Sequence, residues 1–225
     1  MSRRLAVTGF PGTVEGMLPG GRKMSDNEDR RVSFTQMKDG TRSDYELLQE
    51  LEELYNHGTA PRLLDELAKQ AEETLTGYRI TRLAHALQTA TRAENDGADT
   101  DWIVSALLHD IGDRLAPANH DKFAAEILRP YVRDECTWTV EHHGSFQKIY
   151  YMHHYGGDPE ERRKFAGHPY YQTCADFCER WDQASFDPDF PTRDLDHFRP
   201  AVEKVFARVP HDPTVICKGE VRGLP

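Results

Sequence analysis

The sequence predicts an all-α fold, and three observations carry this prediction. Apolar residues recur at three- and four-residue steps through most of the chain between residues 43 and 207. Capping residues precede these segments, and glycines often follow them. We find no convincing strand pattern and no internal repeat. With 225 residues, of which 38% are hydrophobic, the chain can build a domain with a sizeable core.

The helix boundaries come from caps and breakers. Predicted N-terminal caps are Ser43-Asp44, Asp99-Thr100-Asp101 and Asn119, with Pro61 in a first helical turn. Predicted stops are Gly58, Gly77, Gly97 and Gly144. The predicted helices cover residues 44–57, 61–76, 80–96, 100–110, 120–129, 137–143, 170–184 and 194–207, with another beginning at Asp158-Pro159.

The composition divides the chain into three parts. Residues 1–40 are rich in glycine, proline and charge, which predicts a disordered N-terminal tail. Residues 41–209 hold the periodic segments and form the predicted helical domain. Residues 210–225 are rich in proline and glycine and are predicted to be coil.

The net charge and the cysteine content limit the classes of binding partner and the compartment that we expect. A net charge of −10 and a pI near 5.5 exclude nucleic acid and anionic membranes as bulk partners. No stretch approaches the ~18–20 apolar residues of a membrane span. The four cysteines form no CxxC pair, which is typical of packed thiols in a reducing compartment. We therefore expect a cytoplasmic protein that acts on a small molecule; the sequence does not predict its oligomeric state.

The most informative stretch is the apolar run Trp102–Leu108, which leads directly into His109-Asp110 and Gly112. Burying a carboxylate beside an imidazole is unfavourable without a strong partner. A metal cation suits both groups at once. The doublet therefore predicts a metal site at the end of this helix.

Further candidate ligands occur on most of the other predicted helices. A single histidine is more often a packed or surface residue than a ligand, but the joint pattern indicates a metal site inside a helix bundle. Nitrogen and oxygen donors without thiolate suit Fe, Mn, Co or Zn. The candidates in chain order are His85, His109-Asp110, His120, His142-His143 and Asp182.

This order of ligands resembles the HD-domain superfamily, whose signature H…HD…D corresponds here to His85, His109-Asp110 and Asp182. The resemblance covers roughly residues 75–208 and implies an HD-domain helical bundle. Members with two additional histidines hold two metal ions.

Within that group, Leu83–Ala90 and Glu141-His142-His143 resemble the mixed-valent di-iron oxygenases, namely the aminohydroxyethylphosphonate dioxygenases and, more distantly, the myo-inositol oxygenases. The resemblance implies an Fe(II)/Fe(III) pair bridged by Asp110. It implies His85, His109 and Asp182 on one iron and His120 and His143 on the other. His143 fits better than His142, and only one of two helical neighbours can point inward.

The resemblance does not extend to the substrate side. Tyr78 stands where the phosphonate enzymes have a glutamate, Glu179 where they have an arginine, and Lys148 only near the position of a phosphonate-binding lysine. We predict that Tyr78, Arg82 and Lys148 line the substrate side, although Arg82 also fits a solvated helix residue.

The resemblance therefore implies an oxygenase that cleaves a small hydroxylated substrate, phosphonate-like or polyol-like, with O2. The alternative is a metal-dependent phosphohydrolase or phosphodiesterase, because two-metal members of the superfamily catalyse that reaction as well. A third possibility is a catalytically silent HD module, which the complete ligand set disfavours.

Overall fold

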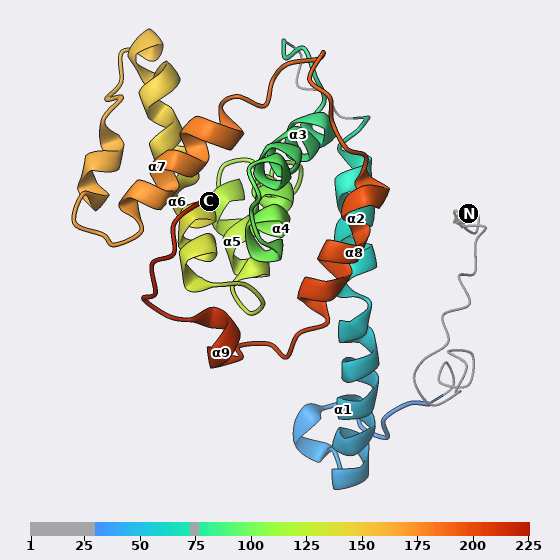
Figure 1. The fold of residues 1–225 in the computed structure, drawn as a ribbon. Helices are drawn as coiled ribbons and strands as arrows, with labels where there is room; N and C mark the ends of the chain where they lie inside the picture. Colours follow the sequence, from blue (N-terminus) through green and yellow to red (C-terminus); the bar gives the residue numbers. More distant parts are fainter. Residues whose placement is uncertain (1–29, 73–76) are drawn as a thin grey trace, which may run out of the picture. The chain divides into compact units, whose positions relative to one another are not determined.

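The computed structural model describes residues 30–72 and 77–225, and the described residues contain helices and no strand. This confirms the predicted all-α class. The α-helices are α1 (Arg42–His57), α2 (Thr59–Lys69), α3 (Arg82–Asn95), α4 (Thr100–Leu108), α5 (His120–Leu128), α6 (Asp134–Tyr151), α7 (Tyr171–Phe177), α8 (Leu195–Phe206) and α9 (Pro213–Ile216) (Figure 1). Shorter helical turns cover Met37–Asp39, Met152–Tyr155, Glu161–Phe165 and Cys178–Asp182.

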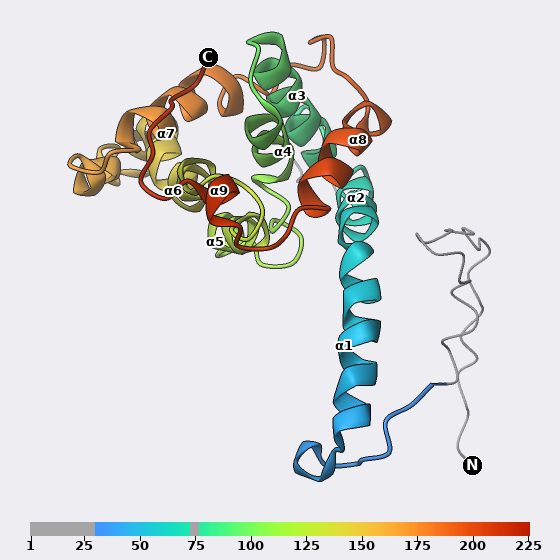
Figure 2. The same cartoon turned by 60° about the horizontal axis from the view of Figure 1, so that its bottom comes forward.

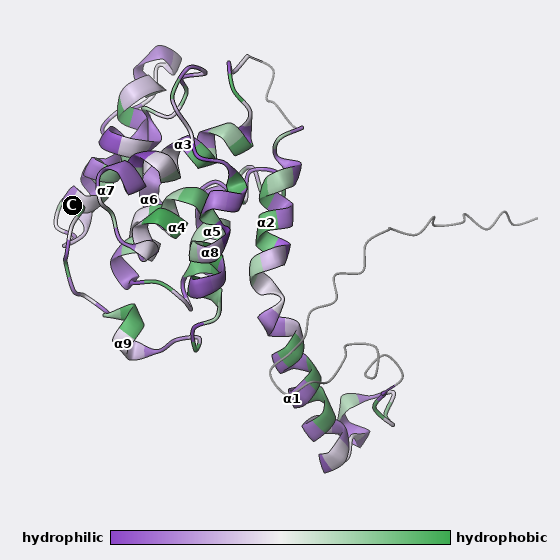
Figure 3. Cartoon of the chain, turned by 45° about the vertical axis from the view of Figure 1, so that its right-hand side comes forward, coloured by the Kyte–Doolittle hydropathy of each residue, from purple (hydrophilic) through white to green (hydrophobic). Residues whose placement is uncertain are grey.

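The chain divides into two compact units, one up to Leu54 and one from Tyr55 onward. In the first unit, hydrophobic and hydrophilic turns alternate along α1 (Figure 3). The carboxylate of Asp44 accepts hydrogen bonds from the backbone N–H and the hydroxyl of both Ser33 and Thr41. Residues 30–40, part of the predicted tail, are thereby tied to α1. The rest of that predicted tail, residues 1–29, lies outside the described part of the chain.

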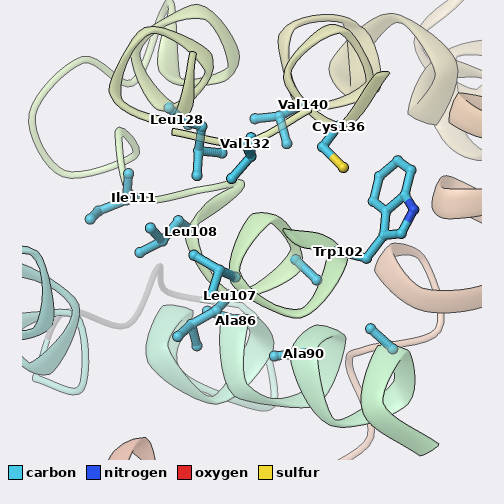
Figure 4. Packing of buried hydrophobic residues seen from close by; sticks show 14 of the residues in the cluster. Ala86, Ala90, Trp102, Leu107, Leu108, Ile111, Leu128, Val132, Cys136 and Val140 are labelled. Atoms are coloured by element: carbon cyan, nitrogen blue, oxygen red, sulfur yellow. The ribbon is translucent and has the colours of Figure 1, made fainter. Parts of the chain in front are cut away.

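The core of the second unit forms around α4, which packs against both α3 and α8. All nine residues of α4 except Thr100 and Ile103 are buried. As predicted, Asp99 caps this helix, accepting a hydrogen bond from the Trp102 N–H. Figure 4 shows how Leu107 and Leu108 point between α3 and the layer formed by α5 and α6. The doublet at the end of α4 is therefore delivered into the interior.

The prediction that Gly144 ends a helix over 137–143 is wrong, because α6 runs continuously from Asp134 to Tyr151. A glycine inside a helix costs only ~0.5–1 kcal/mol. The fully buried Phe146, just beyond Gly144, offsets that cost by packing into the core. The longer α6 carries His143 to the middle of the helix.

The predicted helix over 170–184 is divided in two. After α7, the chain widens into a π-helical turn over Cys178–Asp182. Such turns interrupt the regular helix and often lie at functional sites. Here the turn ends on Asp182, a predicted ligand. The helix predicted at Asp158-Pro159 is instead a short 3₁₀ turn, Glu161–Phe165.

The C-terminal segment, predicted as coil, contains α9 and is fixed to the bundle. It passes α5 and the start of α6 and ends near α7 (Figure 2). The buried Glu135 carboxylate accepts hydrogen bonds from the backbone N–H groups of Arg222 and Gly223 and from the Thr173 hydroxyl. The Trp102 indole N–H donates to the Gly223 carbonyl. In the described part, no helix has the length and apolar character needed to cross a membrane.

We expect Glu135→Ala to lower the free energy of unfolding by about 2–4 kcal/mol, because three donors would lose a buried charged acceptor. Chemical denaturation followed by circular dichroism measures this. Glu141→Ala on the same helix is the matched control: Glu141 forms a partly exposed ion pair with Arg129, and its loss should cost less than about 1 kcal/mol. Equal effects of the two substitutions would contradict a fixing role for Glu135.

Candidate metal centre

Three predicted ligands from separate elements converge on one point. His85 comes from α3, His109 follows α4, and Asp182 ends the π-helical turn. The Nε2 atoms of the two histidines are 3.2 Å apart, and Asp182 Oδ1 lies 3.2 Å from His85 Nε2 and 3.5 Å from His109 Nε2. Two imidazoles and a carboxylate thus face one another over the spacing that a shared cation requires.

Asp110 divides its two carboxylate oxygens between two groups of histidines. Its Oδ2 lies 3.3 Å from His109 Nε2 and 3.5 Å from His85 Nε2. Its Oδ1 lies 3.2 Å from His143 Nε2 and 3.5 Å from His120 Nε2. Asp110 therefore stands between two sets of nitrogen donors, in the arrangement of a bridging ligand.

Of the two neighbouring histidines on α6, His143 faces Asp110 and His142 does not. The His142 ring stacks on Trp138 at 4.4 Å between ring centroids, and His168 stacks on Trp138 as well, at 4.1 Å. His142 and His168 are thus packed with an aromatic side chain away from the candidate centre.

Backbone carbonyls fix the orientation of all four converging imidazoles. The Nδ1 atoms lie 2.9 Å from the Ser185 carbonyl for His85, 2.7 Å from Ala106 for His109, 2.7 Å from Val140 for His143 and 3.3 Å from Pro117 for His120. A carbonyl can only accept, so each Nδ1 carries the proton. Each Nε2 then presents a lone pair to the shared space, as a metal ligand does.

The electrostatics of the centre demand positive charge. Burial opposes ionisation of Asp110, yet its attraction to His109 and its contact with His143 hold the pKa of that carboxyl well below its usual range. Burial also opposes the charged form of His109, but Asp110 and Asp182 raise its pKa well above the ordinary value. The pKa of His143 is raised in the same way by Asp110. Protons on the imidazoles or metal cations can supply this charge.

Metal cations fit the residues present better than protons do. Asp110 Oδ1 and Asp182 Oδ2 are buried and have no hydrogen-bond donor. Leaving such oxygens without a partner costs roughly 1–3 kcal/mol each, and more when they are charged. Two cations, one on each side of Asp110, would satisfy both oxygens and all four Nε2 lone pairs.

A cavity of about 530 Å³ opens above the candidate centre. Five aromatic side chains line it together with Gln147 and Gln183: Tyr78, Tyr150, Tyr151, Tyr155 and Phe186. Of the described lining residues, none is lysine or arginine. Phe186 stacks on both His85 and Tyr78, with ring centroids 4.6 Å and 5.5 Å apart.

The three residues predicted for the substrate side have different surroundings. Tyr78 lines this cavity and a smaller adjoining one of about 270 Å³. Arg82 lines only the smaller one and forms an ion pair with Asp113. Lys148 is paired with Glu161 and lines neither.

Sequence reasoning missed Phe186 and Asp113. Asp113 follows Asp110 by one helical turn, and that spacing was the available signal. Phe186 lies just beyond the last ligand, where no pattern distinguishes it.

A family model and a curated relative match parts of this chain. Residues 82–172 match the family model described as HD domain. A relative from Leisingera caerulea, [1-hydroxy-2-(trimethylamino)ethyl]phosphonate dioxygenase (glycine-betaine-forming), is 27% identical over 168 residues. The matched region covers 61% of this chain and 85% of the relative.

We expect His143→Ala to reduce the bound metal from about two ions per chain to about one, since it removes a ligand from only one side of Asp110. Elemental analysis after reconstitution with a divalent metal measures the ratio. His142→Ala is the matched control and should retain about two ions, because that ring packs on Trp138. Metal loss in the His142 variant, with none in the His143 variant, would reverse this assignment.

Proposed function

Because the chain belongs to the HD-domain superfamily, we propose that it is a dinuclear, mixed-valent iron oxygenase that cleaves a small hydroxylated substrate with O2. The observation that carries the proposal is the division of the Asp110 carboxylate between two pairs of histidine Nε2 atoms. Two irons, when bound, would supply redox chemistry toward O2 and Lewis acidity toward a substrate hydroxyl.

The donor set supports iron over a thiolate-preferring metal. It consists of imidazole nitrogens and carboxylate oxygens. The nearby thiols of Cys174 and Cys178 donate to the α6 carbonyls of Thr139 and His143, at 3.6 and 3.7 Å. They serve helix packing and take no place among the candidate ligands.

The cavity supports a substrate with a cationic end. The relative acts on a phosphonate that carries a trimethylamino group, and the faces of aromatic rings attract such ammonium groups. Burial raises the pKa of Tyr150 to about 12, so its phenol stays neutral at physiological pH. We propose that the hydroxyl and anionic groups of the substrate face the metals while its ammonium end lies among the tyrosines.

Phosphohydrolase activity would use the same metals but is less well supported. The observation that favours oxygenase chemistry over hydrolysis is that the relative is a dioxygenase. A silent module is disfavoured as well, because nothing else would require four imidazole lone pairs and two acceptor-only oxygens to be buried together.

Within this proposal, the residues of the chain act by positioning and exclusion. The backbone carbonyls hold the four imidazoles, and Asp110 would be a ligand of both metals. Phe186, stacked over His85, covers one ligand from the cavity side.

We expect protein loaded anaerobically with iron and partly oxidised to show a mixed-valent EPR signal. On addition of a 1-hydroxy-2-(trimethylammonio)alkyl phosphonate, it should consume O2. Asp110→Ala should abolish both, because the bridge is lost. Hydrolysis of phosphoesters with Mn²⁺ or Co²⁺, together with an absent EPR signal and no O2 uptake, would favour the hydrolase instead.

We expect Tyr150→Leu to raise KM for the ammonium substrate by ~5–30-fold, equivalent to ~1–2 kcal/mol of lost cation–π attraction. KM for an uncharged tert-butyl analogue should change little. Steady-state O2 uptake measures both constants. Tyr55→Leu, which removes a tyrosine outside the cavity lining, is the control. An equal rise in KM for both compounds would contradict an ammonium site.

A further inference from the structure

Asp113 presents its two carboxylate oxygens to two different partners. It lies in the turns that follow α4, one turn beyond Asp110. Its Oδ1 is 3.4 Å from His120 Nδ1, and its Oδ2 forms an ion pair with Arg82 Nη1. The Asp113 side chain is only 14% exposed, so both contacts are shielded from bulk water. Arg82, Asp113 and His120 thus form a connected row.

The direction of the His120 ring places Asp113 behind the ligand. His120 Nε2 faces Asp110 Oδ1 at 3.5 Å, whereas Nδ1 faces the Pro117 carbonyl at 3.3 Å and Asp113 Oδ1 at 3.4 Å. The two nitrogens of an imidazole point to opposite sides of the ring. Asp113 therefore supports His120 from the far side, as the carboxylate of a carboxylate–histidine–metal arrangement does.

His120 differs from the other three converging histidines in two ways. Its side chain is 29% exposed, against 8% for His85, 0% for His109 and 4% for His143. Among the described contacts of these four Nδ1 atoms, only that of His120 includes a carboxylate. His120, the most exposed of the four, is thus the one whose Nδ1 faces a carboxylate.

Local structure makes this support specific. Arg82 lies one turn before His85 on α3, so the two side chains lie on the same face of this helix. Gly112 allows the turn to approach α5, since a Cβ there would lie 2.8 Å from the Cα and the carbonyl oxygen of His120. The backbone of His120 is therefore held against the same turn that carries Asp110 and Asp113.

Building on the proposed dinuclear centre, we infer that Asp113, held in place by Arg82, is a positioning residue that orients His120 and strengthens the second metal site. A carboxylate that accepts from imidazole Nδ1–H fixes the ring and makes Nε2 a better donor. Arg82 then acts through Asp113.

The test is a Co²⁺ titration of the metal-free full-length protein, followed by visible absorption. Asp113→Asn should weaken the second binding step by ~10–100-fold and change the spectrum of the second Co²⁺, leaving the first step unaltered. Asp121→Asn is the matched control. It makes the same chemical change next to His120, on a carboxylate that accepts a hydrogen bond from the Lys122 backbone N–H. It should leave both steps unaltered.

A second pair of variants separates positioning from general stability. Arg82→Gln should weaken the second step, and Arg82→Lys should restore it in part, because a cation again holds Asp113. If wild-type protein binds two ions and Asp113→Asn binds both with unchanged affinity and spectrum, the inference is overturned. If wild-type protein binds only one ion, the dinuclear proposal itself fails, so the two failures are distinguishable.

Discussion

A buried carboxylate oxygen without a hydrogen-bond donor has to be matched by positive charge, and Oδ1 of Asp110 is in that position. Four imidazole Nε2 atoms lie 3.2–3.5 Å from the Asp110 carboxylate oxygens. The Nδ1 protons of three of these rings face backbone carbonyls, and that of His120 faces both a carbonyl and Asp113. Lone pairs therefore face lone pairs around a carboxylate inside the bundle. Two cations would resolve this conflict, and protonation of the imidazoles is the competing solution.

The helices meet this constraint by delivering ligands from rigid positions. The apolar α4 carries the His109-Asp110 doublet into the interior, while α3 and the uninterrupted α6 bring His85 and His143 alongside. The π-helical turn places Asp182 opposite them. The more exposed His120, at the start of α5, depends on its neighbours, and Gly112 and Asp113 are the residues that hold it. On the open side, five aromatic side chains line the cavity.

Much of the fold could be predicted because its signals are local. The cap at Asp99, and the apolar spacing within each helix, depend on residues a few positions apart. The six converging side chains could be named from a sequence resemblance, and the structure brings them together. Predictions that depended on tertiary partners fared differently. Packing of Phe146 carries α6 through Gly144, and Glu135 holds a tail that composition alone assigned to coil. Arg82 and Lys148, predicted to line the substrate side, form ion pairs with Asp113 and Glu161, and the sequence does not predict these pairs.

Anomalous diffraction from crystals grown with iron, recorded at the iron absorption edge, tests the central claim most directly. The account predicts two peaks, one on each side of the Asp110 carboxylate, with His85, His109 and Asp182 around the first and His120 and His143 around the second. A single peak, with His120 and His143 coordinating nothing, would contradict it.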